Sequence, residues 1–228
     1  MTRTTDKLSG IGMTSSRTRA RMIERLREQG IRDEVVLAAI HAVPRHIFVD
    51  EALAIRAYED SPLPIGFGQT ISQPYVVARM TELVRGGGPL ERVLEIGTGC
   101  GYQTAVLAQV AAEVYTVERV WGLVQKARRN LLSLRIRNVR LKHGDGSADL
   151  GEDLEFDGIV VAAATSFVPP TLVRYLRTGG RLVLPLLQAR SGDDSGEQRL
   201  TLIEKAAGGL REQTGEAVRF VPLLSGMG

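Results

Sequence analysis

The sequence has few of the residues that form metal centres or disulfide frameworks. Of its 228 residues, one is a cysteine (Cys100) and three are histidines (His41, His46 and His143), and the histidines have no metal-ligand spacing with the cysteine. A single cysteine excludes an internal disulfide framework and fits a reducing compartment. We therefore expect no bound metal and read the histidines as structural.

Long apolar runs and a strong charge bias are also missing. No apolar stretch approaches the roughly 18 residues that a membrane span needs, and the polar N-terminus lacks the apolar core of a secretory signal. Aromatic residues make up 5% of the chain and the net charge is +3. Basic residues interleaved with apolar ones, as in 3–32 and 128–142, favour solvated faces over polyanion sites. We expect a cytoplasmic monomer that binds neither membranes nor nucleic acid.

The pattern of apolar residues divides the chain into an N-terminal extension and one domain. Residues 1–12 are polar and without periodicity, which predicts disorder. Helical spacing predicts helices over 16–29 and from an N-cap at Asp33 to just before Pro44, and a short helix near Asp50. Within a single domain, 13–228, we expect a helical cap over 13–60, a functional loop over 61–74 and an α/β core over 75–228.

After Gly88 the sequence alternates between strand and helix patterns. Strands are expected at 93–96, 114–117, 139–142, 158–163 and 181–186, with helices between most of them. This βαβ rhythm calls for a mainly parallel sheet with helices on both faces. Two further strands, 199–205 and 217–223, are expected to add antiparallel at the edge, which gives seven strands in a Rossmann-like α/β fold.

A glycine turn after the first of these strands indicates a nucleotide-like ligand. The segment reads RVLEIGTGCGYQT, with Gly97, Gly99 and Gly101 between a buried strand and a helix. Such turns present backbone N–H groups to a ligand, and a side chain would block its close approach. Cys100 lies inside the turn, but no histidine is near it in sequence, so we read it as a small packing residue and not a nucleophile.

Acidic residues near the turn indicate which ligand it holds. Glu118 ends the second strand and can accept hydrogen bonds from ribose hydroxyls, although it could instead be a surface partner of Arg119. Glu95 precedes the turn, where a carboxylate repels a pyrophosphate but tolerates a sulfonium or ammonium group, unless it points away into a helix cap or a local salt bridge. Asp145 and Gly146 follow the third strand, where Asp145 can accept from an adenine amine or form a common turn. Together with the Gly-x-Gly-x-Gly spacing, these residues favour S-adenosylmethionine over NAD.

A proline- and glycine-containing stretch precedes this core. It reads SPLPIGFGQTISQP over Ser61–Pro74, with interleaved apolar residues that indicate an ordered loop. Long loops inside compact domains are usually functional or disordered.

These residues together resemble the protein-L-isoaspartate O-methyltransferase family. The likeness runs from Met13 to Leu224, and its most specific motif is PLPIGFGQTISQP; it continues through PRHIFVDEAL, RVLEIGTGCGYQTAVLAQ, FDGIVVAAA, LRTGGRLVLPL and VRFVPLL. The resemblance implies methyl transfer from S-adenosylmethionine to the free carboxylate of L-isoaspartyl residues in damaged proteins and peptides. It implies S-adenosylhomocysteine as the product and repair through a succinimide.

The resemblance also implies roles for individual residues. Ser72 is the expected active-site residue, although it could instead be the N-cap of the helix that starts near Pro74. The expected lid over cofactor and substrate comprises Ile65, Gly66, Phe67, Gly68, Gln69 and Thr70. The expected cofactor-binding residues are Glu95, Gly97, Thr98, Gly99, Gly101, Glu118, Asp145 and Gly146.

Other functions are compatible with part of the sequence, and two segments differ from the pattern of the family. A nucleic-acid methyltransferase is the leading alternative, because related folds modify tRNA, but it calls for a basic groove with stacking aromatics. A nucleotide-sensing module without catalysis explains the glycine turn but not the Ser61–Pro74 loop, and the glycine spacing disfavours an NAD-dependent oxidoreductase. The polar segment Ser191–Gln198 is longer than its turn requires, and the C-terminal residues 224–228 receive no cofactor contacts.

Overall fold

The N-terminal part of the chain forms a layer of short helices. The computed structural model describes residues 10, 12–150, 154–190 and 193–228, so most of the predicted disordered extension lies outside the described residues. A 3₁₀ turn (Gly12–Thr14) precedes α2 (Ser16–Glu28) and α3 (Glu34–Ala42), and two 3₁₀ helices follow at Arg45–Phe48 and Glu51–Arg56. The Asp33 carboxylate accepts from the backbone N–H groups of Val35 and Val36, so the predicted N-cap of α3 is confirmed.

The predicted loop over 61–74 contains a β-hairpin. Strands β1 (Leu63–Gly66) and β2 (Gln69–Ile71) pair antiparallel, with Leu63 opposite Ile71. The three residues at its tip, Gly66, Phe67 and Gly68, all have positive φ. Tight left-handed turns of this kind favour glycine, so the two glycines explain why the chain can reverse here. Helix α4 (Pro74–Arg85) follows directly and ends at Gly86, also in the left-handed region.

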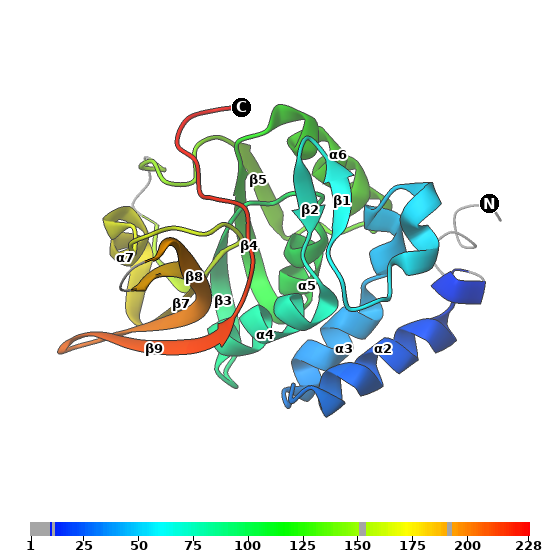
Figure 1. Ribbon diagram of the computed structural model, residues 1–228, viewed down its shortest axis with the longest axis horizontal. Helices are drawn as coiled ribbons and strands as arrows, with labels where there is room; N and C mark the ends of the chain where they lie inside the picture. Colours follow the sequence, from blue (N-terminus) through cyan, green and yellow to red (C-terminus); the bar gives the residue numbers. More distant parts are fainter. Residues whose placement is uncertain (1–9, 11, 151–153, 191–192) are drawn as a thin grey trace.

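A seven-stranded sheet forms the centre of the molecule, as predicted (Figure 1). Its strands run in the order β5-β4-β3-β6-β7-β8-β9, of which the first five are parallel and the last two antiparallel. The strands are β3 (Leu90–Ile96), β4 (Ala111–Glu118), β5 (Val139–His143), β6 (Phe156–Val161), β7 (Leu176–Arg190), β8 (Asp193–Ala206) and β9 (Gly209–Ala217).

Helices cover both faces of this sheet, because alternate residues of each buried strand point to opposite faces. On β3, Val93 packs in a cluster with α4 and with α5 (Tyr102–Val110), whereas Leu94 packs on the other face with α7 (Pro170–Tyr175). Helix α6 (Trp121–Ser133) covers the end of the sheet near β4 and β5. The α/β class predicted from the βαβ rhythm is therefore confirmed.

The predicted last strand is wrong. Residues 217–223 were expected to be a strand, but β9 occupies Gly209–Ala217. Beyond it the segment forms no further strand: the Val218 N–H donates to the Gln198 carbonyl of β8, and Pro222 forms a single bridge with Ala164. Proline has no N–H to donate to a ladder, which fits Pro222 lying outside a strand. Of the polar segment expected as an insertion at 191–198, residues 193–198 belong to β8, which pairs with β7 as far as Arg190 and Asp193, and residues 191–192 lie outside the described residues.

No described helix is long and apolar enough to cross a membrane. The described residues also contain no cluster of His, Cys, Asp or Glu that could hold a metal ion.

Candidate active site

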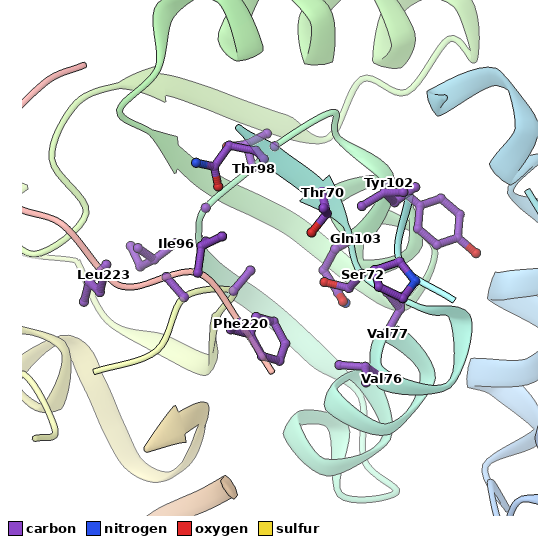
Figure 2. Close-up of a pocket in the computed structure, with 18 of the residues that line it drawn as sticks. Thr70, Ser72, Val76, Val77, Ile96, Thr98, Tyr102, Gln103, Phe220 and Leu223 are labelled. Carbon is purple, nitrogen blue, oxygen red and sulfur yellow. The ribbon is translucent and has the colours of Figure 1, made fainter. Parts of the chain in front are cut away.

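A cavity of about 850 Å³ lies at the carboxyl ends of the parallel strands. Its floor is the glycine turn after β3 together with the ends of β4 and β6, the position at which open α/β sheets bind ligands. The hairpin end and the start of α4 form one wall, and the segment after β9 forms the opposite wall. Figure 2 shows Thr70 and Ser72 on one side of the cavity and Phe220 and Leu223 on the other. This volume suits a ligand of nucleoside size.

The glycine turn adopts the geometry that its sequence predicts. Gly97 has φ of 93° and its N–H donates to the Val117 carbonyl at 2.9 Å, which turns the chain from β3 toward α5. A side chain would be strained at this φ. Gly97, Thr98 and Gly99 line the cavity, whereas Gly101 does not and instead packs against Ala127 of α6, which would lie 3.3 Å from an added Cβ.

Glu118 lies where a ribose-binding carboxylate is expected. It ends β4, is 6% exposed, and lines the cavity. Its two carboxylate oxygens accept from the backbone N–H groups of Gly99 and Val120, both at 2.9 Å. These bonds hold the carboxylate at the cavity wall, and each oxygen keeps a second lone pair for a ligand hydroxyl.

Glu95 is close to the cavity but does not line it. The side chain is fully buried beneath the turn and accepts from the Thr104 and Thr116 hydroxyls at 2.5 and 2.6 Å. Burial raises the pKa of Glu95 to about 8. The sequence suggested an ionised carboxylate beside the ligand, with a side chain that points away as the alternative. In the structure the side chain does not line the cavity, and its carboxyl is buried and mostly neutral at pH 7.

Of the neighbouring residues Asp145 and Gly146, only Gly146 lines the cavity. Gly146 lines the cavity, and an added Cβ would lie 2.3 Å from Ile96 Cγ2, so the close approach of this turn to the end of β3 favours glycine. Asp145 does not line the cavity; its carboxylate accepts from Ser147 and, at 2.6 Å, from the backbone N–H of Gly226. Burial raises the pKa of Asp145, but these hydrogen bonds outweigh burial and hold it below its usual value.

Ser72 lies in the cavity wall with its hydroxyl available. Gln73, and not Ser72, occupies the N-cap position of α4, which has no side-chain cap. The Ser72 hydroxyl makes no hydrogen bond to any described residue, and Ser72 lines the cavity next to Thr70. The alternative role as an N-cap is therefore absent from this structure.

The expected lid residues divide between cavity and surface. Gln69 and Thr70 line the cavity, whereas Ile65 to Gly68 do not. Ile65 is buried against the glycine turn, and its carbonyl accepts from Lys126 at 3.0 Å. Phe67 is 62% exposed, yet its ring lies over Gly122 at the start of α6, 2.1 Å from where a Cβ would be. The tip of the hairpin therefore rests on α6.

The C-terminal wall of the cavity was not predicted from the sequence. Residues from Glu216 to Leu224 line the cavity, and the tail then reaches the strand ends, where Arg119 donates to the Gly226 carbonyl at 2.9 Å. Gln198 fixes the start of this segment by bonding both the N–H and the carbonyl of Phe220. Pro222 was the signal available in the sequence, because proline argues against a strand.

Cys100 is buried inside the turn, and burial raises the pKa of its thiol to about 11. A protonated, enclosed thiol is a poor nucleophile, in agreement with the packing role expected for it.

Comparison with known proteins decides the family. The family model described as protein-L-isoaspartate(D-aspartate) O-methyltransferase matches residues 17–228. The chain belongs to this family. It is 60% identical over 223 residues to a protein-L-isoaspartate O-methyltransferase from Methylobacillus flagellatus, covering 96% of this chain and 97% of the relative. A second relative of that name, from Dechloromonas aromatica, is 60% identical over 220 residues and is covered to 99%, with 96% of this chain aligned.

Solved structures agree with this assignment. One protein-L-isoaspartate O-methyltransferase structure superposes with a TM-score of 0.79 at 30% identity, covering 92% of this chain and 67% of its own. Another structure, from Plasmodium falciparum and in complex with S-adenosyl-L-homocysteine, superposes with a TM-score of 0.73 at 28% identity. The match covers 90% of this chain and 97% of that chain. The family, the fold class, the enzyme class and S-adenosylmethionine as cofactor are therefore confirmed, while the roles of individual residues remain predictions.

The cavity fits this cofactor on its own geometry. It combines a glycine turn that a ligand can approach closely, a glycine at position 146 that no larger residue can replace without displacing Ile96, and a carboxylate at Glu118 placed for hydroxyl groups. All three features belong to the side of the cavity formed by the strand ends, whereas Ser72 lies in the wall formed by the hairpin and α4.

Proposed function

We propose that this chain methylates the free carboxylate of L-isoaspartyl residues in proteins and peptides, with Ser72 holding the carboxylate. The observation that carries this assignment of Ser72 is its position. It lines the cavity wall formed by the hairpin and α4, opposite the C-terminal segment, and its hydroxyl has no partner among the described residues. Thr70 and Gln69 lie beside it in the same wall.

The chemistry of this reaction matches the residues present. A carboxylic acid with a pKa of about 4 is already ionised at neutral pH, so no general base is needed. S-adenosylmethionine, when bound, supplies an electrophilic methyl group on a sulfonium sulfur. A bond forms between a carboxylate oxygen and the methyl carbon, the sulfur keeps the electron pair of the broken bond, and no proton moves.

The protein contributes position and exclusion of water. The Ser72 hydroxyl donates to one carboxylate oxygen and leaves the other free to attack. The transition state loses charge relative to the separated anion and cation, so a dry cavity lowers the barrier, and alignment of the reacting atoms contributes further. Ile71, Val76 and Val77, with Phe220 opposite, give the cavity near Ser72 an apolar lining.

The product has a direct consequence for the damaged substrate. A methyl ester loses methanol far more readily than a carboxylate loses oxide, so the neighbouring backbone nitrogen can close a succinimide ring. Water then opens that ring to aspartyl or isoaspartyl linkages, and the enzyme acts again on the latter.

The deciding experiment incubates the full chain with labelled S-adenosylmethionine and two peptides that differ only in an isoaspartyl or aspartyl linkage. We expect label in the isoaspartyl peptide as a base-labile methyl ester and little in its partner. Equal labelling of the two peptides would contradict the proposal, and label found only in added RNA would assign the chain to the nucleic-acid alternative.

We also propose that the β1–β2 hairpin is the lid and that Phe67 on Gly122 is its latch. Replacing Gly122 with alanine puts a methyl group where the Phe67 ring lies, so the ring must move off α6. Because Phe67 is 62% exposed, it can swing away with little loss of fold stability. We expect kcat/KM for the peptide to fall roughly five-fold, equivalent to about 1 kcal/mol of transition-state stabilisation.

A double-mutant cycle separates this latch from a general helix effect. In a Phe67→Ala background, Gly122→Ala should have no further effect, because the clash is gone. Gly88→Ala is the matched control, since its Cβ meets no atom closer than 3.8 Å. Equal effects of Gly122→Ala in both backgrounds would show that Phe67 is not a latch.

A further inference from the structure

A chain of hydrogen bonds runs from the cavity wall to the buried carboxyl of Glu95. The Thr98 and Thr116 hydroxyl oxygens are 2.6 Å apart, and the Thr116 hydroxyl donates to Glu95 Oε2, also at 2.6 Å. Thr104 of α5 donates to the same oxygen at 2.5 Å. Thr98 lines the cavity, whereas Thr116, Thr104 and Glu95 are fully buried. None of these contacts is used by the reaction described above.

The direction of this chain depends on whether Glu95 carries a proton. An ionised carboxylate only accepts, so the Thr116 proton is committed to Glu95 and the Thr98 proton is committed to Thr116. Thr98 then turns only its oxygen lone pairs toward the cavity. A neutral Glu95 can donate through Oε2. In that case each hydrogen bond of the series reverses its direction, and Thr98 turns a proton toward the cavity.

The second oxygen of Glu95 shows that the ionised form is incompletely stabilised. Glu95 Oε1 is buried and has no hydrogen-bond partner among the described residues. A buried carboxylate with one unsatisfied oxygen is costly, so the resting protein favours the neutral form.

We propose that Glu95 is a positioning residue which sets the direction of the Thr98 hydroxyl, and that binding of the cationic cofactor drives the proton off Glu95. S-adenosylmethionine brings a sulfonium and an ammonium group, and a cation in this cavity favours both an ionised carboxyl below it and a hydroxyl that presents lone pairs. The proton leaves to solvent. The hydrogen bonds then have a single direction, in which Thr98 donates to Thr116 and Thr116 donates to Glu95. The inference rests on the cofactor and not on the role of Ser72.

The surroundings of Glu95 support this coupling. Burial raises its pKa to about 8, the two threonine hydroxyls act in the opposite direction, and the carboxylate of Glu118 raises it further. On the sheet, β6 places the apolar Val160 beside Glu95, and α5 contributes Thr104. Glu118 is the one charged side chain among the causes that shift the pKa of Glu95, and its negative charge attracts a bound cation.

Calorimetry of cofactor binding without a methyl acceptor tests the proposal. We would titrate S-adenosylmethionine into the full chain at pH 7 in two buffers of different ionisation enthalpy, which gives the number of protons released. With the pKa of free Glu95 at about 8, wild type should release roughly 0.9 proton more than Glu95→Gln. The difference should fall to roughly 0.1 proton at pH 9.

The affinity gives an independent readout of the same linkage. Binding that requires ionised Glu95 becomes roughly eight-fold tighter between pH 7 and pH 8.5 in wild type, relative to Glu95→Gln over the same range. A proton count that is equal in wild type and Glu95→Gln, or a wild-type count that does not change with pH, would overturn the proposal.

Two further measurements guard against a variant that fails to fold. Thr116→Ser keeps the hydroxyl and should retain the proton release, whereas the isosteric Thr116→Val should reduce it and weaken binding roughly ten-fold. In wild type alone, carbon-13 resonances of the glutamate carboxyls should include one that titrates near pH 8 and that moves to the ionised position on adding S-adenosylmethionine. No such resonance, or unchanged proton release in Thr116→Val, would contradict the coupling.

Discussion

Replacing Ser72 with alanine should lower kcat about a hundred-fold, the size of effect seen when one donor to a reacting oxygen is removed. The affinity for S-adenosylmethionine should stay within about two-fold, because the residues that are expected to bind the cofactor lie on the glycine turn and at the end of β4. Single-turnover rates with an isoaspartyl peptide measure the first quantity, and calorimetry without peptide measures the second.

Two comparisons make the result specific to the hydroxyl. Ser72→Thr keeps a hydroxyl at the same position and should recover much of the rate. Ser133→Ala removes an exposed hydroxyl that bonds the Asn130 carbonyl at the end of α6, away from the cavity, and should change nothing. If cofactor binding fell in step with the rate in Ser72→Ala, Ser72 would belong to the cofactor site instead.

The sequence predicts the parts of this fold that depend on local patterns. The apolar run that becomes β3, the glycines of its turn and the apolar spacing of α4 each specify one element from a few adjacent residues. The Asp33 N-cap also depends on a local pattern, since its carboxylate accepts from N–H groups that are two and three residues further along the sequence. These predictions were correct because the interactions that determine each element join residues that are close in sequence.

What the sequence did not predict depends on contacts between distant residues. Glu95 precedes the turn in sequence, but its side chain lies under α5, where it bonds Thr104 and does not line the cavity. Asp145 accepts from Gly226, 81 residues later, and the cavity wall after β9 depends on Gln198 holding Phe220. No local pattern carries such information, so the C-terminal segment was given the wrong element and no role.

The contact between the N-terminal helices and the core also depends on distant residues, and Arg45 is its centre. This side chain is fully buried, and its Nε donates to the Ala57 carbonyl at 2.8 Å. Its guanidinium lies over the ring of Tyr102, with Cζ 4.8 Å from the ring centroid, and Tyr102 lines the cavity. Arg45 has no salt bridge with a described carboxylate, so carbonyl groups and an aromatic face hold its charge.

Replacing Arg45 with alanine should therefore lower the free energy of unfolding by about 3 kcal/mol, measured by urea denaturation of the unliganded chain at pH 7. The change leaves a cavity beside Tyr102 and an unpaired carbonyl at Ala57, and it removes the cation–π contact. Arg45→Lys should recover only part of this loss, because an ammonium cannot stack on the ring and reach the carbonyl in the same way.

Arg56→Ala is the matched control: that side chain is 49% exposed and pairs with Glu59 at 3.0 Å, so its loss should cost less than about 0.5 kcal/mol. Equal losses for the Arg45 and Arg56 variants would mean that the buried arginine does not join the helical cap to the cavity wall.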